Sequence, residues 1–385
     1  MLINFLRTSF HGFHDLQLTS FTRPFQKKIY NLSLSRATAS PSEKMESQPP
    51  CVLVLSGKSA SEEEVAKSLK EKSSLRLADD VKLLTFLQPE MERQPQEDEF
   101  NIDTYMASLT TTCFGRVLLW SPRLPSTQDV VSLNFCEIPV GSVCIADVQF
   151  KGRGRSQNVW ESPKGGLLFS FTIQMEDGRV VPLVQYIVCL AMTEAIKDLA
   201  LKNGIPPLDV RIKWPNDLYL DGLKVGGILC TSTYRSKKFN VSAGVGLNVD
   251  NDKPTTSLNA ALRKLTSGCL LRREDIASAF FNKFEHLYHI LINKGEYFLV
   301  DKSKHMPHFK RFQPLEELYY KAWLHSGQRI IVQEKREDQD LPLENVVTVQ
   351  GLTPSGYLLA IADNGEMCEL HPDGNRYYAQ YVLLK

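Results

Sequence analysis

The sequence predicts an α+β fold in which a mixed sheet flanked by helices is followed by a small C-terminal antiparallel barrel. Between about residues 113 and 300, short apolar runs typical of strands alternate with two segments whose apolar residues recur at helical spacing. Beyond Trp323, short apolar runs are separated by glycine and asparagine turns, a pattern typical of small antiparallel barrels. The 385 residues are enough for two or three domains, at roughly 100–200 residues each.

Composition narrows the class of protein. The hydrophobic content of 43% allows large buried cores, and a net charge of +1 gives no general attraction to nucleic acid or membrane, so we expect neither as a partner. No apolar run approaches the roughly 18 residues that a spanning helix needs. The eight cysteines include no CxxC pair, which favours reduced, mostly buried thiols over disulfides or a zinc site.

Residues 1–44 differ from the rest of the chain. They are basic and rich in serine and threonine, and their only acidic residues are Asp15 and Glu43. This composition is typical of an organelle transit peptide, and a second methionine, Met45, stands where it ends. We hypothesise a long form that enters a chloroplast or mitochondrion and a cytosolic form that starts at Met45. The alternative is a disordered tail with an ordinary internal methionine.

Residues 45–112 are expected to form a small α/β segment. An apolar run at Cys51–Leu55 predicts a strand, and the acidic segment Glu62–Leu69 predicts a helix. The polar stretch Pro89–Glu99 is typical of a linker or surface loop. Because the segment contains neither a helix-turn-helix nor a basic recognition helix, we expect no DNA binding, and its role stays open.

The central block, residues 113–322, is expected to form one domain built on a sheet. Its predicted strands are Val143–Val148, Leu167–Ile173, Val210–Lys213, Val225–Thr231 and Val241–Val249. Its predicted helices are Pro182–Leu201 and Asp275–Leu291. Turn residues at Pro215–Asp217 and Asp221–Gly222 indicate a hairpin-like unit, and the basic stretch 298–312 has the character of an insertion.

Residues 323–385 are expected to form the barrel. The predicted strands are Arg329–Val332, Val346–Val349, Tyr357–Ile361 and Met367–Leu370. Gly351, Gly356 and the pair Asn364-Gly365 supply the turns between them.

The segment Lys151-Gly-Arg-Gly-Arg155 carries the strongest functional signal. Glycines let a backbone close around a ligand, and guanidinium groups between them can bind phosphate or carboxylate oxygens in pairs. Because predicted strands lie on both sides of it, this loop is expected to be held by rigid elements. On its own it indicates an anion site without naming the anion.

Three further clusters accompany the loop. Ser126-Thr127-Gln128 lies at an expected strand-to-helix turn, Lys213–Asp217 reads Lys-Trp-Pro-Asn-Asp, and Lys224 precedes two glycines. Each has an ordinary explanation when taken alone. The hydroxyls are more often a helix cap, isolated lysines are usually solvated, and Trp160 or Trp214 would usually belong to a core.

Together, in this order and at these separations, the clusters resemble the biotin protein ligase family, and the plant-type holocarboxylase synthetases in particular because of the basic leader. The matching segments are Gly152–Arg155, Trp160, Ser162-Pro163, Lys213–Asp217, Lys224–Gly227 and Gly244–Asn248. The resemblance covers about residues 115–385. It implies a class II aminoacyl-tRNA-synthetase-like catalytic domain and an SH3-like C-terminal barrel.

The resemblance implies an ATP-dependent ligase. Biotin and Mg²⁺-ATP would form biotinyl-5′-AMP and pyrophosphate, and a lysine on the biotin carboxyl-carrier domain of a carboxylase, of the acetyl-CoA carboxylase type, would then displace AMP. The repressor domain of some bacterial relatives has no counterpart here, so no binding to DNA is implied. Some bacterial relatives dimerise, and the resemblance leaves a homodimer open.

Roles for individual residues follow from the same resemblance. The biotin head group would be bound by Ser126, Thr127, Gln128 and Gln149. The carboxylate and the phosphate would be covered by Arg153, Gly154, Arg155 and Lys224. The ATP phosphates, and Mg²⁺ through them, would be handled by Lys213, Asn216 and Asp217. The pocket would be lined by Gly244, Gly246 and Asn248, with Trp160 near the adenine.

Physical reasoning supports a ligase of this type. Joining a carboxylate to a triphosphate brings two anions together, so prearranged cations must neutralise the developing charge, and such groups are worth roughly 3–4 kcal/mol each. Two alternatives stay open. One is a lipoate or octanoate ligase of the same fold, and the other is a noncatalytic biotin sensor that regulates partners.

Overall fold

The protein is described by a computed structural model that covers residues 51–77, 81–85, 98–268, 270–293, 312–334, 343–372 and 377–378. The leader at residues 1–44, Met45 and nearly all of the stretch 298–312 lie outside the described residues, as does most of the Pro89–Glu99 linker.

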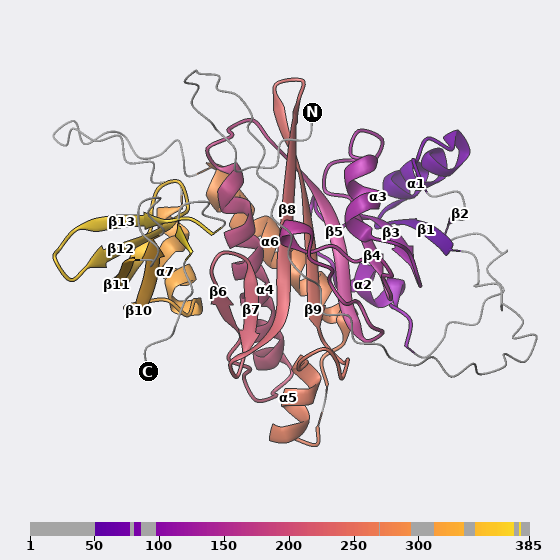
Figure 1. Ribbon diagram of the computed structural model, residues 1–385. Helices are drawn as coiled ribbons and strands as arrows, with labels where there is room; N and C mark the ends of the chain where they lie inside the picture. Colours follow the sequence, from indigo (N-terminus) through magenta and orange to yellow (C-terminus); the bar gives the residue numbers. More distant parts are fainter. Residues whose placement is uncertain are drawn as a thin grey trace, which may run out of the picture.

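A nine-stranded mixed sheet forms the centre of the molecule (Figure 1). Its order is β2-β1-β3-β4-β5-β9-β8-β7-β6, with β1–β2 and β3–β4 parallel and the other pairs antiparallel. The strands are β1 Cys51–Gly57, β2 Val81–Thr85, β3 Val117–Ser121, β4 Val143–Ala146, β5 Gly166–Met175, β6 Arg211–Lys213, β7 Asp217–Leu220, β8 Leu223–Arg235 and β9 Lys238–Asn248.

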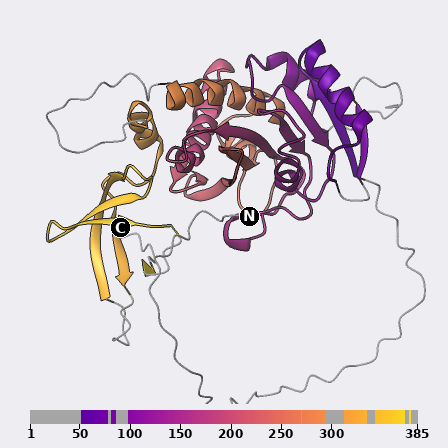
Figure 2. The ribbon, with the colours of Figure 1, turned by 90° about the horizontal axis from the view of Figure 1, so that it is seen from above.

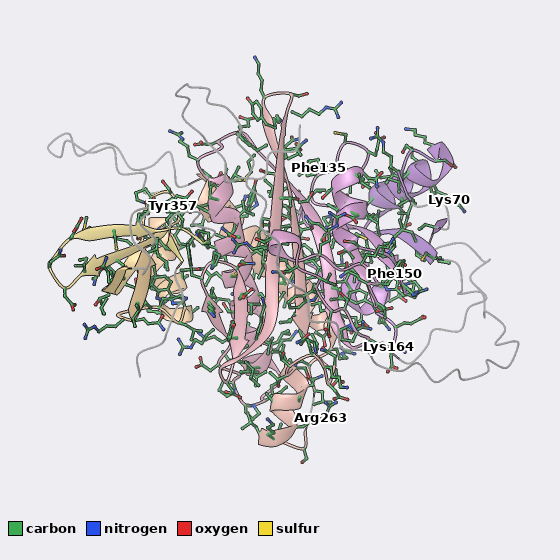
Figure 3. All side chains as sticks on the ribbon, in the orientation of Figure 1. Lys70, Phe135, Phe150, Lys164, Arg263 and Tyr357 are labelled. Carbon is green, nitrogen blue, oxygen red and sulfur yellow. The ribbon has the colours of Figure 1, made fainter. Side chains whose placement is uncertain are left out.

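Two long helices, α4 (Val184–Lys202) and α6 (Arg273–Asn293), cover one face of this sheet, as the view in Figure 2 shows. Side-chain alternation along β5 explains why. Phe169 and Phe171 contact the rings of Phe280, Phe281 and Phe284 in α6, and together they form an aromatic core. Figure 3 shows the side chains on the ribbon, among them the labelled Lys70 and Arg263. The helices are α1 Ala60–Lys72, α2 Ile102–Ser108, α3 Thr127–Leu133, α4 Val184–Lys202, α5 Leu258–Leu265, α6 Arg273–Asn293 and α7 Gln313–Ala322.

The opposite face of β5 is polar and faces α3. Ser170 lies between the two phenylalanines and bonds to Thr127 in α3, with 2.9 Å between the two hydroxyl oxygens. Ser170 is also directly opposite Gly244 in β9. The sheet therefore separates an apolar helix layer from a small-residue face, and the small-residue face is where the predicted site residues lie.

The C-terminal residues form a separate antiparallel sheet of order β13-β12-β11-β10-β14. Its strands are β10 Arg329–Glu334, β11 Leu343–Leu352, β12 Leu358–Ala362, β13 Met367–Leu370 and β14 Tyr377–Tyr378. The expected fold class is thus confirmed: a mixed sheet with helices, followed by a small antiparallel sheet. Tyr186 and Trp214 from the main domain both donate hydrogen bonds to the carbonyl of Gly356, which ties the two units together.

All ten strands and all three helices predicted within the described residues are present, with ends shifted by a few residues. The elements that sequence reasoning missed are β2, β3, β7, β14, α2, α3 as a whole helix, α5 and α7. Most of these are short, and short segments carry too few residues to show a periodicity. Strands β1 and β2 also join the main sheet rather than standing apart. No helix among the described residues is long and apolar enough to cross a membrane.

Candidate active site

The glycine-arginine loop forms a narrow hairpin. The Gly154 N–H donates to the Asn158 carbonyl at 2.7 Å, and the Trp160 N–H donates to the Gly152 carbonyl at 3.0 Å. A Cβ atom at Gly152 would lie 2.3 Å from the Trp160 carbonyl oxygen, so only glycine permits this approach. At the tip, Ser156 has a φ of +51°, in the left-handed region that favours glycine. The hairpin holds the loop together, and its two arginine side chains extend to partners in other parts of the chain.

The two arginines of the loop have different partners. Arg155 Nη1 donates to Asn216 Oδ1 at 3.0 Å, and Asn216 in turn donates to the carbonyl of Ile228 in β8 at 2.6 Å. Arg153 Nε lies 2.9 Å from Asp129 Oδ1 in the first turn of α3. Arg155 is therefore joined to the Lys213–Asp217 segment, while Arg153 is paired with helix α3.

Lys224, Asp217 and Trp160 form one cluster. Lys224 Nζ lies 2.6 Å from Asp217 Oδ1 and 5.5 Å from the centre of a Trp160 ring. The lysine and aspartate side chains are 36% and 25% exposed, so this ion pair opens onto solvent. A charge that is already exposed to solvent can contact an anionic ligand directly.

A β-bulge in β8 turns Lys224 toward this cluster. Asp217 lies opposite Gly227 and Tyr219 lies opposite Lys224, which leaves Val225 as an extra residue in β8. Side chains alternate between the faces of a sheet, so Lys224 would lie on the far face from Gly227 without that extra residue. The bulge thus places the lysine on the same face as Asp217.

Glycines form the floor beneath Trp160. Lys213, Asp217, Gly227 and Gly246 are directly opposite one another across four strands. A Cβ atom at Gly246 would lie 2.4 Å from Trp160 Nε1, and one at Gly227 would lie 3.5 Å from the same indole. The indole packs against the bare backbone of both strands, and its N–H is buried without a hydrogen-bond partner among the described residues.

A polar pocket lies beside this floor, at the start of α3. Thr127 donates to Gln149 Oε1 from its backbone N–H at 2.7 Å and from its hydroxyl at 3.0 Å. Gln128 Oε1 and Ser126 Oγ are buried and lack a partner among the described residues. Ser126 is the N-cap residue of α3, but its side chain makes no capping bond, so the alternative helix-cap role is wrong for its hydroxyl. Buried polar atoms are normally satisfied, so these two are suited to a ligand.

The remaining predicted residues have structural partners. A Cβ atom at Gly244 would lie 2.6 Å from Gln128 Oε1, so this glycine makes room for the pocket. Asn248 Nδ2 donates to the Thr256 carbonyl at 3.0 Å and thereby holds the segment that follows β9. The Lys213 ammonium lies 5.2 Å from the centre of the Tyr219 ring. These contacts place Gly244 in the pocket, tie Asn248 to the segment after β9 and put Lys213 on the edge strand, opposite Asp217.

Sequence reasoning overlooked several side chains that complete the site. Asp129 follows Gln128 directly and pairs with Arg153. Ser162, which belongs to a matching segment but has no predicted role, accepts a hydrogen bond from Gln149 Nε2 at 3.0 Å. Ser170 is the clearest omission, because a small polar residue at an alternate position of an otherwise apolar strand is a readable signal.

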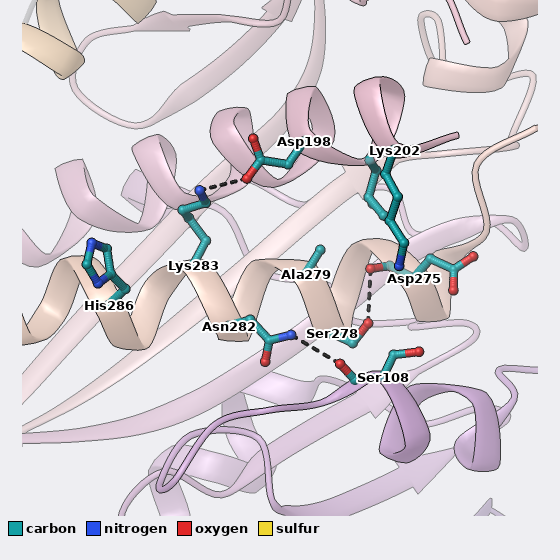
Figure 4. A pocket seen from close by; sticks show the side chains of 10 residues that line it. Ser108, Asp198, Lys202, Asp275, Ser278, Ala279, Asn282, Lys283 and His286 are labelled. Carbon is teal, nitrogen blue, oxygen red and sulfur yellow. Dashed lines mark hydrogen bonds and ion pairs between the residues drawn. The ribbon is translucent and has the colours of Figure 1, made fainter. Parts of the chain in front are cut away.

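A cleft of about 410 Å³ lies elsewhere, on the helix layer between α2, α4 and α6 (Figure 4). One of its two lysines is already paired, because Lys283 Nζ lies 2.7 Å from Asp198 Oδ2. Asn282 donates to the carbonyl of Ser108 at 3.1 Å. None of the predicted site residues lines this cleft, so it is separate from the site described above.

Comparison with known proteins agrees with this geometry. The Biotin/lipoate A/B protein ligase family matches residues 120–248. "Biotin--protein ligase 1, chloroplastic" of Arabidopsis thaliana is 55% identical over 96% of this chain and 94% of its own length. "Biotin--protein ligase 2" of the same plant is 56% identical over 86% of this chain and 97% of its own length.

Among solved structures, the biotin protein ligase from Aquifex aeolicus in complex with biotin and ATP is 22% identical, with a TM-score of 0.47. The match covers 69% of this chain and 99% of that one. The residues matched by the family model, 120–248, hold the glycine floor and Lys224, so the class indicated for this part of the chain is that of the biotin and lipoate protein ligases. Identity above 50% to two plant relatives, over 96% and 86% of the chain, places the chain in the biotin–protein ligase family.

Proposed function

We propose that the chain couples biotin to protein in two steps. The biotin carboxylate attacks the α-phosphate of ATP, which forms biotinyl-5′-AMP and releases pyrophosphate. The ε-amine of an acceptor lysine then attacks the carbonyl carbon of the mixed anhydride, an amide bond forms, and AMP leaves with the bonding electrons. The placement of Lys224 between Asp217 and Trp160, above a glycine floor, is the observation that carries this proposal.

The polar pocket suits the biotin head group. A ureido ring presents N–H donors and one carbonyl acceptor, and the pocket offers the unpartnered acceptor Gln128 Oε1 and the unpartnered hydroxyl of Ser126. Thr127 and Gln149 hold each other in place beside them, so their positions are fixed before a ligand arrives. We assign all four residues to the head group.

Lys224 and Arg155 are assigned to the reacting groups. An ammonium group has three N–H donors, and Asp217 uses one of them, so two remain for carboxylate and phosphate oxygens. Arg155 reaches the same region through Asn216. Arg153 is 61% exposed and its pair with Asp129 is correspondingly weak, so it can be exchanged for an anionic ligand. With Gly154 between them, both arginines would close over the adenylate.

Magnesium would enter with ATP as part of the substrate. The described residues contain no group of three His, Cys, Asp or Glu side chains able to hold a metal ion. One oxygen of Asp217 already faces Lys224, which leaves the other oxygen for an ion that is held mainly by phosphates. Lys213, Asn216 and Asp217 would line the phosphates, and Trp160 would lie near the adenine.

For the second step, we propose a biotin carboxyl-carrier domain of a carboxylase as the acceptor. Its lysine must lose a proton before it attacks, and a nearby carboxylate helps to orient the amine. Asp217 is the carboxylate that lies beside Lys224. No side chain of the chain is needed as a nucleophile, because the adenylate is itself the activated acyl group.

A direct assay tests the proposal. Purified protein is incubated with biotin, Mg²⁺-ATP and a biotin carboxyl-carrier domain, and both pyrophosphate release and acceptor labelling are measured by mass spectrometry. We expect both signals to require biotin. Absence of pyrophosphate would reject ligase activity, and labelling that lipoate but not biotin competes away would favour a lipoate or octanoate ligase. Biotin binding that survives Arg155→Ala and Lys224→Ala without functional loss would favour a sensor.

We also propose that residues 1–44 direct the long form to an organelle and that a form starting at Met45 stays in the cytosol. The composition of the leader supports this, and a relative 55% identical to the chain is named as chloroplastic. Reporter fusions of residues 1–44 should accumulate in plastids or mitochondria. A fusion that stays in the cytosol would reject the targeting role.

A further inference from the structure

The C-terminal segment makes a direct hydrogen bond to the Lys213–Asp217 segment. The backbone N–H of Trp214 donates to His325 Nε2 at 3.0 Å, and both residues are buried. The bond extends a short parallel pairing, because Ile212 bridges to Trp323 and the Leu324 N–H donates to the Ile212 carbonyl at 2.9 Å. His325 thus lies beside the end of β6, which is the edge strand of the nine-stranded sheet.

The partner of the second ring nitrogen of His325 determines that Nε2 can accept this hydrogen bond. His325 Nδ1 and Gln328 Oε1 are 2.7 Å apart. A carboxamide oxygen only accepts, so Nδ1 carries the proton and Nε2 is left as the acceptor that Trp214 needs. Burial lowers the pKa of His325, and the nearby charge of Lys213 lowers it further, which favours the neutral ring. Gln328 therefore fixes the tautomer.

The position of Trp214 affects the reacting groups through Asn216 and Asp217, the last two residues of the Lys213–Asp217 segment. Asn216 accepts from Arg155, and Asp217 pairs with Lys224. Trp214 is held at a second point, because its indole N–H donates to the Gly356 carbonyl at 3.2 Å. Both restraints come from the C-terminal part of the chain. They act together with main-domain contacts, because the same indole N–H also donates to the Tyr186 hydroxyl at 3.1 Å and Asn216 bonds to Ile228 in β8. The C-terminal part thus helps to hold the segment that carries Asn216 and Asp217.

We propose that His325, oriented by Gln328, is a positioning residue for adenylate formation that acts through the backbone of Trp214. The inference rests on the proposed ligase function. Without the acceptor, the buried Trp214 N–H has no partner and the segment shifts to find one. Misplacement of reacting groups by about 1 Å can cost on the order of 100-fold in rate. The head-group pocket at Ser126 and Gln128 is built from other elements, so biotin affinity should be kept.

Three variants test this in the full-length protein: His325→Leu, His325→Gln and Gln328→Leu. At saturating biotin and ATP we expect His325→Leu to slow pyrophosphate release by roughly 10- to 100-fold, with the dissociation constant for biotin unchanged within about twofold. His325→Gln should recover most of the rate, because its carboxamide oxygen can accept from Trp214. Gln328→Leu should fall between them. His289→Leu, at an exposed position of α6, is the matched control.

Each outcome decides the matter. A wild-type rate in His325→Leu, or a folded His325→Gln with no recovery, overturns the inference. Equal losses of rate and biotin affinity also overturn it, since they indicate general damage. If His325→Leu fails to fold, His325→Gln and Gln328→Leu still give the comparison. A wild-type protein without any pyrophosphate release rejects the proposed function itself, whereas an active wild type with unaffected variants rejects only the role of His325.

Discussion

At the scale of single residues, the site depends on the absence of a side chain at two glycines. Gly227 and Gly246 lie opposite each other in β8 and β9, and the indole of Trp160 occupies the space that side chains would fill. The resemblance predicts Gly246 as a pocket-lining residue, but it does not say what packs against it. That answer needs the hairpin at Gly152–Trp160, whose pairing no local pattern predicts.

A substitution at Gly246 tests the glycine floor. In Gly246→Ala the new methyl group would lie 2.4 Å from Trp160 Nε1, so the indole must move away. We expect kcat/KM for ATP to fall by about tenfold, since overpacking of this kind costs about 1–3 kcal/mol. Pyrophosphate release measures the effect. Gly268→Ala, where the nearest atom is Thr266 Oγ1 at 3.2 Å, serves as the control and should stay near wild type. Unchanged ATP kinetics in Gly246→Ala would contradict the assignment of Trp160.

Lys224 is the residue whose loss should cost the most. Its ammonium is held by Asp217 on the reacting face, so Lys224→Met removes a prearranged donor worth roughly 3–4 kcal/mol in the transition state. We expect pyrophosphate release to slow by roughly 100- to 1,000-fold while the protein stays folded. Lys238→Met removes the same charge at a half-exposed position of β9 and should change little. A loss below about tenfold in Lys224→Met would argue against a direct role.

At the scale of elements, the sequence predicts the longest helices and strands, and the elements that it misses are mostly short. Helices α4 and α6 are readable because each carries several turns of apolar periodicity. The bulge at Val225 is not readable in this way, although it determines the direction of Lys224. A bulge appears only when the register of two strands is compared, and register is a property of the pair rather than of either strand.

The start of α6 is tied to β4 by a buried ion pair. Arg273 Nη1 lies 2.6 Å from Asp147 Oδ1, and the Phe100 N–H donates to the same oxygen at 3.1 Å. Burial raises the pKa of Asp147 from its ordinary 3.8 to about 6, against the opposing pull of Arg273. In the folded state the carboxyl therefore holds its proton up to a higher pH than it does in the unfolded chain.

This shift has a definite sign for stability. A carboxyl with a raised pKa stabilises the fold fully below pH about 4, and that contribution is lost as the pH rises to about 6. Two pKa units correspond to about 3 kcal/mol. We expect the difference in unfolding free energy between wild type and Asp147→Asn to decrease by up to that amount across this window, as measured by urea unfolding. A difference that rises with pH would show that Arg273 outweighs burial.

At the scale of the whole molecule, distant parts of the chain complete one another. The C-terminal sheet holds Trp214, and the N-terminal strands extend the central sheet. The sequence shows a small N-terminal α/β segment with no evident role, because strand pairing between segments far apart leaves no local trace. The structure gives the segment a position: four residues of β1 pair with β3, from Gly57 opposite Val117 to Val54 opposite Trp120.

Removal of this segment should destabilise the remaining fold as well as shorten the chain. β1 and α1 cover Leu119 of β3, which is fully buried, so a chain that begins at Asp98 would expose an unpaired, apolar edge strand. Such edges are prone to pair with other molecules. We expect the protein that starts at residue 98 to aggregate or to unfold at a markedly lower temperature, as measured by size-exclusion chromatography and thermal unfolding.

The matched control is a chain that begins at Met45, which keeps β1, β2 and α1. It should elute as a single species, unfold near the temperature of the full-length protein and keep its rate of pyrophosphate release. Equal melting temperatures and elution volumes for the chains starting at 45 and 98 would contradict a structural role for the N-terminal strands. Such a result would show that β3 tolerates an open edge and that the catalytic sheet begins at Val117.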